Sequence, residues 1–418
     1  MKPIGPIPPP FAGQGALWIG GRTVAEWVEG TGTTPLFLYD FSVVGDRVAR
    51  LRAVLPAGVD VHYAIKANPF APLLRAIAPL VDGFDVASAG ELRAALGVKP
   101  AGAISFAGPG KRDAELEDAI LAGATINLES EGEAARALAI GDRTGVRPRL
   151  AVRVNPDFEL RGSGMRMGGR ASPFGVDADR AVALVRKIRS AGADWRGFHI
   201  FAGSQALDTQ AIIETQAATL ALAARLAEEA GAAPPLVNLG GGFGIPYFAG
   251  DTPVDVEAVG AALGDALASR EGVLAESRFA LELGRWLVGE AGVYLTRVVD
   301  RKESQGEIFL VVDGGLHHQL AASGNFGTVV RRNYPVALAE RLDAPATETV
   351  SVVGCLCTPL DRLADRIALP HAEPGDVIAV FLAGAYGLSA SPAAFLSHPV
   401  PAQILAGSAG NPNAIFTS

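Results

Sequence analysis

Short apolar runs alternate with stretches of mixed polarity between about residues 35 and 290. The apolar runs lie near residues 59–65, 81–86, 103–106, 125–128, 150–155, 197–201, 236–240 and 279–284. Each run has the length of a buried strand and helical patterns separate the runs, which is typical of βα units around a parallel sheet. Eight such units predict a (β/α)8 barrel.

Local signals mark where two of the intervening helices begin. Ser88 and Glu91 have the spacing of a capping box ahead of Leu92, and Asp177 precedes an apolar stripe at positions 182, 185 and 188. These signals predict helices after the second and fifth strands.

The pattern changes after about residue 290, where runs rich in β-branched residues are separated by Gly, Pro and Asp. We therefore predict a second, β-rich domain that the start of the chain joins with a strand pair. The three predicted parts are an N-terminal segment of residues 1–34, a barrel of residues 35–289 and a C-terminal β-domain of residues 290–418.

Composition narrows the classes of function. The 418 residues carry a net charge of −8 without a long Lys/Arg run, so nothing indicates binding to nucleic acid or to an anionic membrane. The N-terminus lacks a signal-peptide pattern, and the apolar segment VIAVFLAGAYGL is too short to span a bilayer. The two cysteines, Cys355 and Cys357, lack the spacing of a zinc pair, so we expect no metal site and a reducing, cytoplasmic location.

Candidate chemistry gathers where the predicted strands end. Active sites of (β/α)8 barrels are built from the loops at the carboxyl ends of the strands. Lys66 follows the first strand, a glycine triplet at 240–242 follows the seventh, and Glu282 and Arg285 close the eighth. Glycine N–H groups with an arginine suit a phosphate, to which Ser204 adds a hydroxyl. An amine, a phosphate cradle and an acid are the groups that pyridoxal phosphate requires.

The sequence also resembles a known family, the fold-type III pyridoxal-phosphate decarboxylases, which include diaminopimelate, ornithine and arginine decarboxylases. The resemblance runs through nearly the whole chain and is carried by YAIKAN, FDVASAGEL, GPGK, INLES, GSQ, LGGGFGIPY, ELGR, CTPLD and GAY. It implies that Lys66 holds the cofactor as a Schiff base and that Glu282 contacts the pyridine nitrogen. It implies a cofactor site that also includes Asp85, Phe201, Ser204, Gly240, Gly241, Gly242, Gly284, Arg285 and Tyr386.

The same resemblance implies a homodimer with shared active sites, in which Cys357 reaches the substrate of the neighbouring subunit. Thr358 and Asp361 follow it in the motif and are the candidate substrate contacts, whereas Cys355 is expected to be structural.

The chain departs from the family at two places. Phe201 stands where the family has a histidine that stacks on the cofactor, and we assign no role in the site to His199. Thr358 stands where diaminopimelate decarboxylases have a glutamate for the distal ammonium of the substrate, and no Arg-Pro pair is found; the nearest basic pair is Arg331-Arg332. Loss of such partners weakens recognition of a free diamino acid.

The substrate therefore stays open between several classes. CTPLD and GFHIFAGSQ look more like the subgroup found beside exosortase A systems and the decarboxylases of carrier-protein-bound glutamyl groups. We expect α-decarboxylation of an amino acid, either free or held on an acyl or peptidyl carrier protein. The alternatives are a diaminopimelate or other diamino acid decarboxylase, an alanine-racemase-like enzyme, and a protein that carries the cofactor without catalysis. A groove leading out of the site would favour the carrier-bound substrate.

Overall fold

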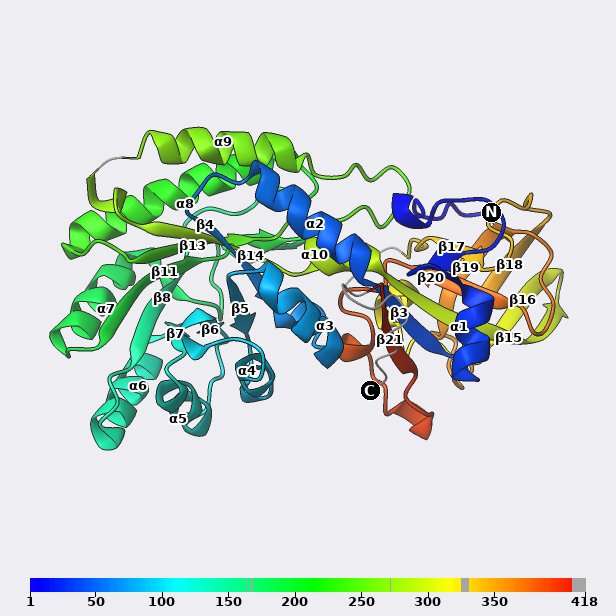
Figure 1. Cartoon of the computed structure of the whole chain (residues 1–418), viewed down its shortest axis with the longest axis horizontal. Coiled ribbons are helices and arrows are strands. Elements are labelled where there is room, and N and C mark those ends of the chain that lie inside the picture. Colours follow the sequence, from blue (N-terminus) through cyan, green and yellow to red (C-terminus); the bar gives the residue numbers. More distant parts are fainter. Residues whose placement is uncertain (163, 167, 271, 325–330, 408–418) are drawn as a thin grey trace.

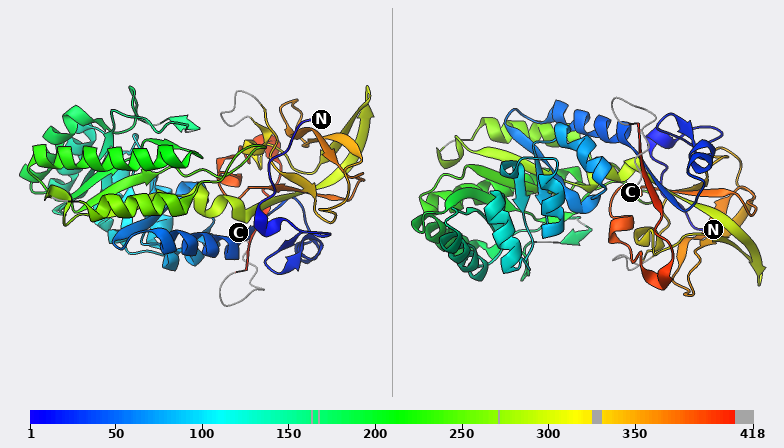
Figure 2. Two further views of the ribbon diagram at one scale, coloured as in Figure 1. Left: turned by 90° about the horizontal axis from the view of Figure 1, so that it is seen from above. Right: turned by 60° about the horizontal axis from the view of Figure 1, so that its bottom comes forward.

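The computed structural model describes residues 1–162, 164–166, 168–270, 272–324 and 331–407. Figure 1 shows a barrel flanked by helices on one side and a β-rich domain on the other. Figure 2 shows from two further directions that the N-terminal segment lies along the β-rich domain.

Parallel strands close the barrel within the described residues. In spatial order each strand pairs with the next, and β7 also pairs with β8, so the sheet has no free edge between these strands. The eight strands are β4 (Val59–Ala64), β5 (Gly83–Val86), β6 (Ile104–Phe106), β7 (Thr125–Leu128), β8 (Arg149–Asn155), β11 (Asp194–Ile200), β13 (Leu236–Gly241) and β14 (Arg278–Leu283). The prediction of a (β/α)8 barrel from the apolar runs is confirmed.

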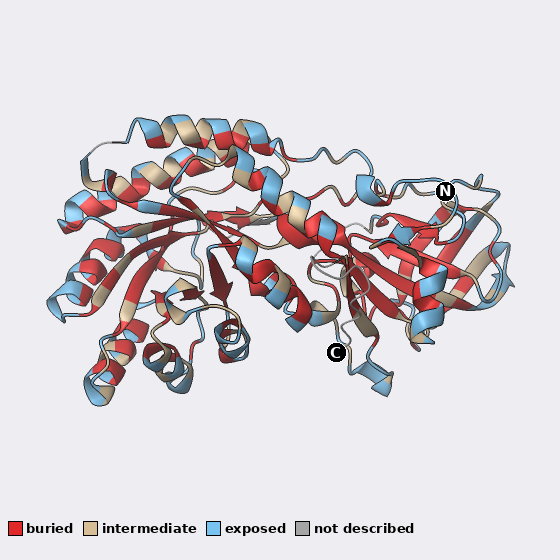
Figure 3. Ribbon diagram, viewed as in Figure 1, coloured by how far each residue is buried: buried red, intermediate tan, exposed pale blue. Residues whose placement is uncertain are grey.

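Helices cover the outer face of this sheet. They are α2 (Phe41–Val54), α3 (Ala71–Ile77), α4 (Ala89–Leu96), α5 (Asp113–Ala122), α6 (Glu131–Thr144), α7 (Ala178–Ser190), α8 (Thr209–Ala230), α9 (Val256–Ala268) and the short α10 (Arg285–Val288). Figure 3 shows the strands buried and the outward faces of the helices exposed.

The two expected helix starts are found in the structure. The Ser88 hydroxyl accepts the N–H of Glu91 at 3.2 Å at the start of α4. Asp177 directly precedes α7 but does not cap it with its side chain; its carboxylate accepts a hydrogen bond from the Asn155 amide at 2.9 Å. The helix begins where the pattern predicts, and the acid instead ties it to the end of β8.

A second sheet forms the β-rich domain. Its longest strand, β15, pairs with β16, β20 and β3, and so connects the parts of the sheet. Its members are β15 (Gly292–Ser304), β16 (Glu307–Val312), β17 (Val336–Leu338), β18 (Glu348–Val353), β19 (Arg362–Leu369), β20 (Val377–Phe381), β21 (Ala402–Ala406) and β3 (Leu36–Asp40).

The start of the chain differs from the expected boundary at residue 35. The hairpin of β1 (Trp18–Ile19) and β2 (Arg22–Thr23) forms a sheet of its own before α1 (Val24–Thr31), and β3 pairs with β15 and β21 in the second domain. The barrel thus begins at α2. All residues of β3 are buried, and a continuous apolar run does not reveal which of two sheets it enters.

Among the described residues, no helix combines the length and apolar character that crossing a membrane requires.

Candidate active site at the carboxyl end of the barrel

Lys66 lies in a single 3-10 turn, Ile65–Ala67, that directly follows β4. The next residue, Asn68, fixes this turn from both sides. Its amide donates to the carbonyl of Gly384 at 3.0 Å, and its own carbonyl accepts the hydroxyl of the buried Tyr63 at 2.9 Å. The Asn68 side chain also accepts the N–H of Phe70 at 3.1 Å. The turn that presents the lysine is therefore anchored to both the barrel and the second domain.

Glu282, near the end of β14, is the acid beside this lysine. One carboxylate oxygen lies 3.4 Å from the Lys66 Nζ, and the other lies 2.9 Å from the Nε2 of the buried His199. Burial alone would raise the pKa of Glu282, but the charge of Lys66 and the hydrogen bond from His199 outweigh it and hold this pKa well below its ordinary value. The pocket thus contains a carboxylate that stays ionised.

The same pair sets the charge of the lysine. Desolvation is the largest influence and lowers the pKa of Lys66, but the charge and hydrogen bond of Glu282, together with Tyr386, outweigh it, and the net shift is upward. The ammonium also lies 5.5 Å from the centre of the Phe201 ring, at the end of β11. Lys66 is therefore a cation in this state, held between a carboxylate and an aromatic face.

The glycine triplet after β13 is required by close packing of the backbone. A Cβ on Gly241 would lie 1.9 Å from the carbonyl oxygen of Glu282, and one on Gly242 would lie 2.1 Å from that of Gly203. Gly240 and Gly242 also have positive φ angles of 69° and 80°. Only glycine lets this segment run so close to its neighbours, and the Gly240 N–H is held by the Asn238 side chain at 2.8 Å.

Arg285 begins α10 and lines the same pocket as Lys66 and Glu282. Its Nη1 donates to the hydroxyl of Tyr247 at 2.7 Å, and its guanidinium lies 4.6 Å from the centre of the Tyr386 ring. Within the described part of the chain, its buried Nε has no hydrogen-bond partner. A buried donor of this kind points to a missing acceptor.

Tyr386 closes the pocket from the second domain. Its backbone has a positive φ of 53°, which a tyrosine adopts rarely, and its N–H donates to the carbonyl of Ala67 at 2.7 Å. The strained tyrosine is thus held directly against the turn that carries Lys66.

These groups line one cavity with an empty volume of about 310 Å³, its open mouth included. The predicted site residues that line it are Lys66, Phe201, Ser204, Gly242, Glu282, Gly284, Arg285 and Tyr386. The cavity therefore joins an amine, an ionised acid, an aromatic face and an arginine with an unused donor.

Residues 42–289 match the family described as pyridoxal-dependent decarboxylase, pyridoxal binding domain. The chain belongs to this family. Its cofactor is pyridoxal phosphate, and it is a decarboxylase, that is, a carboxy-lyase acting on an amino acid.

Similar proteins span most of both chains. The chain is 36% identical over 379 residues to the L-glutamyl-[BtrI acyl-carrier protein] decarboxylase of Niallia circulans, covering 89% of this chain and 88% of that protein. It is 32% identical to the diaminopimelate decarboxylase of Methanothermobacter thermautotrophicus, covering 94% and 91%. The crystal structure of Helicobacter pylori diaminopimelate decarboxylase complexed with L-lysine superposes with a TM-score of 0.82 at 26% identity, covering 94% and 95%.

Some predicted residues lie outside the cavity of their own chain. Asp85 is buried on β5 and lies 3.4 Å from the Nδ1 of His62, while Gly240 and Gly241 pack against neighbouring strands. The loop between β18 and β19 carries the exposed Cys357 and the half-buried Thr358. These two residues do not line the cavity described above.

Asp361, the other predicted substrate contact, is anchored to the backbone of its own chain. Its two carboxylate oxygens accept the backbone N–H groups of Leu316 at 2.6 Å and Leu356 at 2.9 Å. The side chain is buried and packs against the backbone of Gly315 and Gly354. These two hydrogen bonds make Asp361 a brace for the loop that carries Cys357.

The sequence analysis missed three residues around the cavity. His199, to which we assigned no role, bonds Glu282; Arg153 on β8 donates to the Glu129 carboxylate at 2.8 Å and its charge helps keep Glu282 ionised. Tyr247 orients Arg285. The charged residue inside the apolar strand LAVRVN was the one signal for Arg153, since a buried charge requires a partner.

Proposed function

We propose that this chain removes the α-carboxylate of an amino acid that a carrier protein presents, using pyridoxal phosphate held by Lys66. The observation that carries this proposal is the single cavity that joins Lys66, Glu282 and Arg285. The substrate class is supported by the similarity to the glutamyl-carrier decarboxylase of Niallia circulans.

The cavity fits the cofactor at both of its ends. The unpartnered Nε of Arg285 and the glycine backbone of Gly242 and Gly284 in the cavity wall suit a phosphate. Lys66, at the other side, would bind the aldehyde, and the Phe201 ring would cover one face of the cofactor. When bound, pyridoxal phosphate supplies an electron-accepting ring that stabilises the charge left on Cα as CO2 departs.

The residues around the cofactor would control its protons. Glu282 is kept ionised by Lys66 and His199, so it would retain a proton on the pyridine nitrogen. The hydrogen bond from His199 at 2.9 Å keeps the Glu282 carboxylate in one orientation. Lys66 would take back the cofactor as the product amine leaves, and the proton that its nitrogen loses on bonding would pass to that amine.

Cys357 would deliver the proton that replaces the lost carboxylate. In its own chain the thiol is exposed and lies outside the cavity. If the thiol acts on a substrate bound in a second subunit, its place on an exposed loop is explained. Asp361 fixes this loop by accepting two backbone N–H groups. The proposal therefore includes a homodimer in which each site uses Lys66 of one chain and Cys357 of its partner.

A groove beside the cavity supports an extended substrate. It shares Arg285 and Tyr386 with the cavity and continues along the aromatic rings of Tyr247, Phe248 and Tyr334, with an empty volume of about 1410 Å³ that includes its open mouth. Arg332 lies 3.8 Å over the Phe248 ring, and its Nη1 lies 3.8 Å from the carboxylate of Asp251 in the same wall. Since the reaction consumes the α-carboxylate, the carrier must be attached through another group, and the groove provides a path for that attachment.

The second candidate is a decarboxylase of a free diamino acid, favoured by the likeness to the diaminopimelate decarboxylases. The residues that could bind the distal ammonium and carboxylate of a free diamino acid argue against this second candidate. Thr358 carries no charge, and Arg331 donates to the backbone carbonyl of Ser323. No described residue of the cavity offers the Arg-Pro pair sought in the sequence.

The experiment is CO2 release by the cofactor-loaded protein from two sets of substrates. One set holds free diaminopimelate, lysine, ornithine, arginine and glutamate; the other holds glutamyl and related aminoacyl groups on a carrier protein. We expect release from a carrier-bound substrate and little from free amino acids. Efficient release from a free diamino acid would refute the carrier requirement, and amino acids racemised without CO2 would refute decarboxylation itself.

A further inference from the structure

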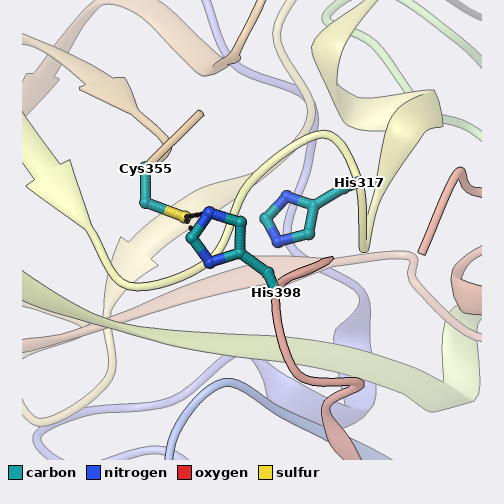
Figure 4. Close-up of side chains that lie close together, drawn as sticks. All are labelled: His317, Cys355 and His398. Atoms are coloured by element: carbon teal, nitrogen blue, oxygen red, sulfur yellow. Dashed lines mark hydrogen bonds between the residues drawn. The ribbon is translucent and has the colours of Figure 1, made fainter. Parts of the chain in front are cut away.

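Three side chains with metal-binding chemistry gather in the β-rich domain, outside the cofactor cavity. His317 comes from the turn after β16, Cys355 from the loop after β18 and His398 from the segment before β21. One ligand atom from each lies within 4.8 Å of the others. Figure 4 shows the three side chains pointing toward one another from separate parts of the chain.

His317 has no hydrogen bond to account for its burial. It is fully buried, and neither of its ring nitrogens has a partner within the part of the chain that the structure describes. Its neighbour His318 is also buried, but its Nδ1 lies 3.1 Å from the hydroxyl of Tyr294 and its Nε2 lies 3.2 Å from the carbonyl of Pro399. Buried polar groups in native proteins are almost always paired. The unpaired imidazole of His317 therefore points to a missing partner.

The other two groups face this imidazole. The Cys355 sulfur lies 3.8 Å from Nε2 and 3.9 Å from Nδ1 of His398. The centres of the His317 and His398 rings are 5.1 Å apart. The two residues before His398, Leu396 and Ser397, both have positive φ angles, 55° and 59°. Strained backbone of this kind persists where the surroundings fix it, which is common at functional sites.

We propose that His317, Cys355 and His398 bind a divalent cation of the zinc type. Imidazole nitrogen and thiolate sulfur are the ligands that zinc prefers, and tetrahedral bond lengths require ligand atoms roughly 3.5 Å apart. A rotation of the His398 ring and small shifts of the side chains bring the observed separations, up to 4.8 Å, into this range. Three protein ligands leave the fourth position for water.

The cation would join three segments that are distant in the sequence. Cys355 lies two residues before Cys357, in the loop that Asp361 braces. A metal at the cluster would fix the same loop from its other side. We assign it a structural role, with an effect on the reaction only through the position of this loop.

The test is metal content of the full-length, cofactor-loaded protein after equilibration with zinc and removal of excess ion. We expect about one zinc per chain, and replacement by cobalt should give the visible absorption of a tetrahedral thiolate site. Cys355→Ser and His398→Gln should lose the metal. Cys357→Ser, which removes the nearby exposed thiol, and His371→Gln, which removes an exposed histidine paired with Glu373, should retain it.

A second measurement guards against variants that fold poorly. Zinc should raise the melting temperature of the native chain and of Cys357→Ser, and leave that of Cys355→Ser unchanged. A native chain without bound zinc would overturn the proposal, and so would Cys355→Ser binding as much zinc as the native chain. If Cys357→Ser lost zinc and Cys355→Ser retained it, the exposed thiol would be the ligand, and the proposal would again be overturned. These readouts do not depend on the substrate, so they separate this proposal from the proposed function.

Discussion

Arg285 offers the sharpest test of how the cavity binds the cofactor. Its Nη1 is already used by the hydroxyl of Tyr247 at 2.7 Å, which leaves the buried Nε as a donor without a partner among the described residues. We expect the phosphate to accept from this donor. Arg285→Lys keeps the positive charge but removes the fixed geometry of the guanidinium.

The size of the effect follows from the bonds that are lost. A hydrogen bond to a charged group contributes about 1.5–3 kcal/mol, which corresponds to a change in Kd of roughly 10–150-fold. We therefore expect Arg285→Lys to weaken binding of pyridoxal phosphate by about this factor. Arg285→Met also removes the charge and should weaken it further. Arg332→Met is the matched control, because Arg332 lies over the Phe248 ring in the groove and does not line the cavity.

The assay compares two ligands of the cofactor-free protein. Titration with pyridoxal phosphate and with pyridoxal, which lacks the phosphate, gives an affinity for each in every variant. If Arg285 binds the phosphate, its replacement lowers the affinity for pyridoxal phosphate and leaves that for pyridoxal unchanged. An equal loss for both ligands, or Arg285→Lys within twofold of the native chain, would refute the assignment.

Three further predictions concern the other groups of the site. Mixing inactive Lys66→Ala and Cys357→Ala chains should restore about a quarter of native turnover, because half of randomly formed dimers contain one intact shared site; a mixture as inactive as its parents would argue against shared sites. The lowered pKa of Glu282 contributes stability above the ordinary pKa of the carboxyl, near 4.5, and this contribution is lost as the pH falls toward the folded-state value. Denaturant unfolding of the cofactor-free protein at pH 7 and pH 4 should therefore show a smaller acid loss in Glu282→Gln, and equal losses would contradict the pairing with Lys66. Asp361→Asn should destabilise the chain by about 1–3 kcal/mol and lower kcat without changing cofactor affinity, since one backbone N–H loses a carboxylate acceptor; unchanged stability in thermal unfolding would rule out the brace.

The barrel was predictable because its strands are buried on both faces. A continuous apolar run bounded by turn residues marks such a strand, and the number of runs gave the architecture. The same signal failed at β3, whose residues are all buried. Local sequence does not record whether a buried strand pairs within the barrel or, as here, with β15 in the second domain.

The site was predictable where function depends on the end of a strand. Lys66, Glu282 and Arg285 lie at such positions, and the family resemblance supplied their expected roles. His199 was missed because its partner Glu282 lies 83 residues away, and only the closed barrel brings β11 and β14 to the same cavity. The brace that Asp361 forms could not be predicted, because the motif does not show that two backbone N–H groups bond to its carboxylate.

The covalent attachment of the cofactor tests the central claim most directly. The protein is loaded with pyridoxal phosphate, the lysine linkage is reduced with borohydride, and the modified peptide is identified by mass spectrometry. Lys111 is the internal control, because it also follows a barrel strand but its ammonium is buried and paired with Glu133 at 2.7 Å. We predict one modified lysine per chain, Lys66. Modification of Lys111, or of no lysine in a protein that retains the cofactor, would contradict the assignment of this cavity.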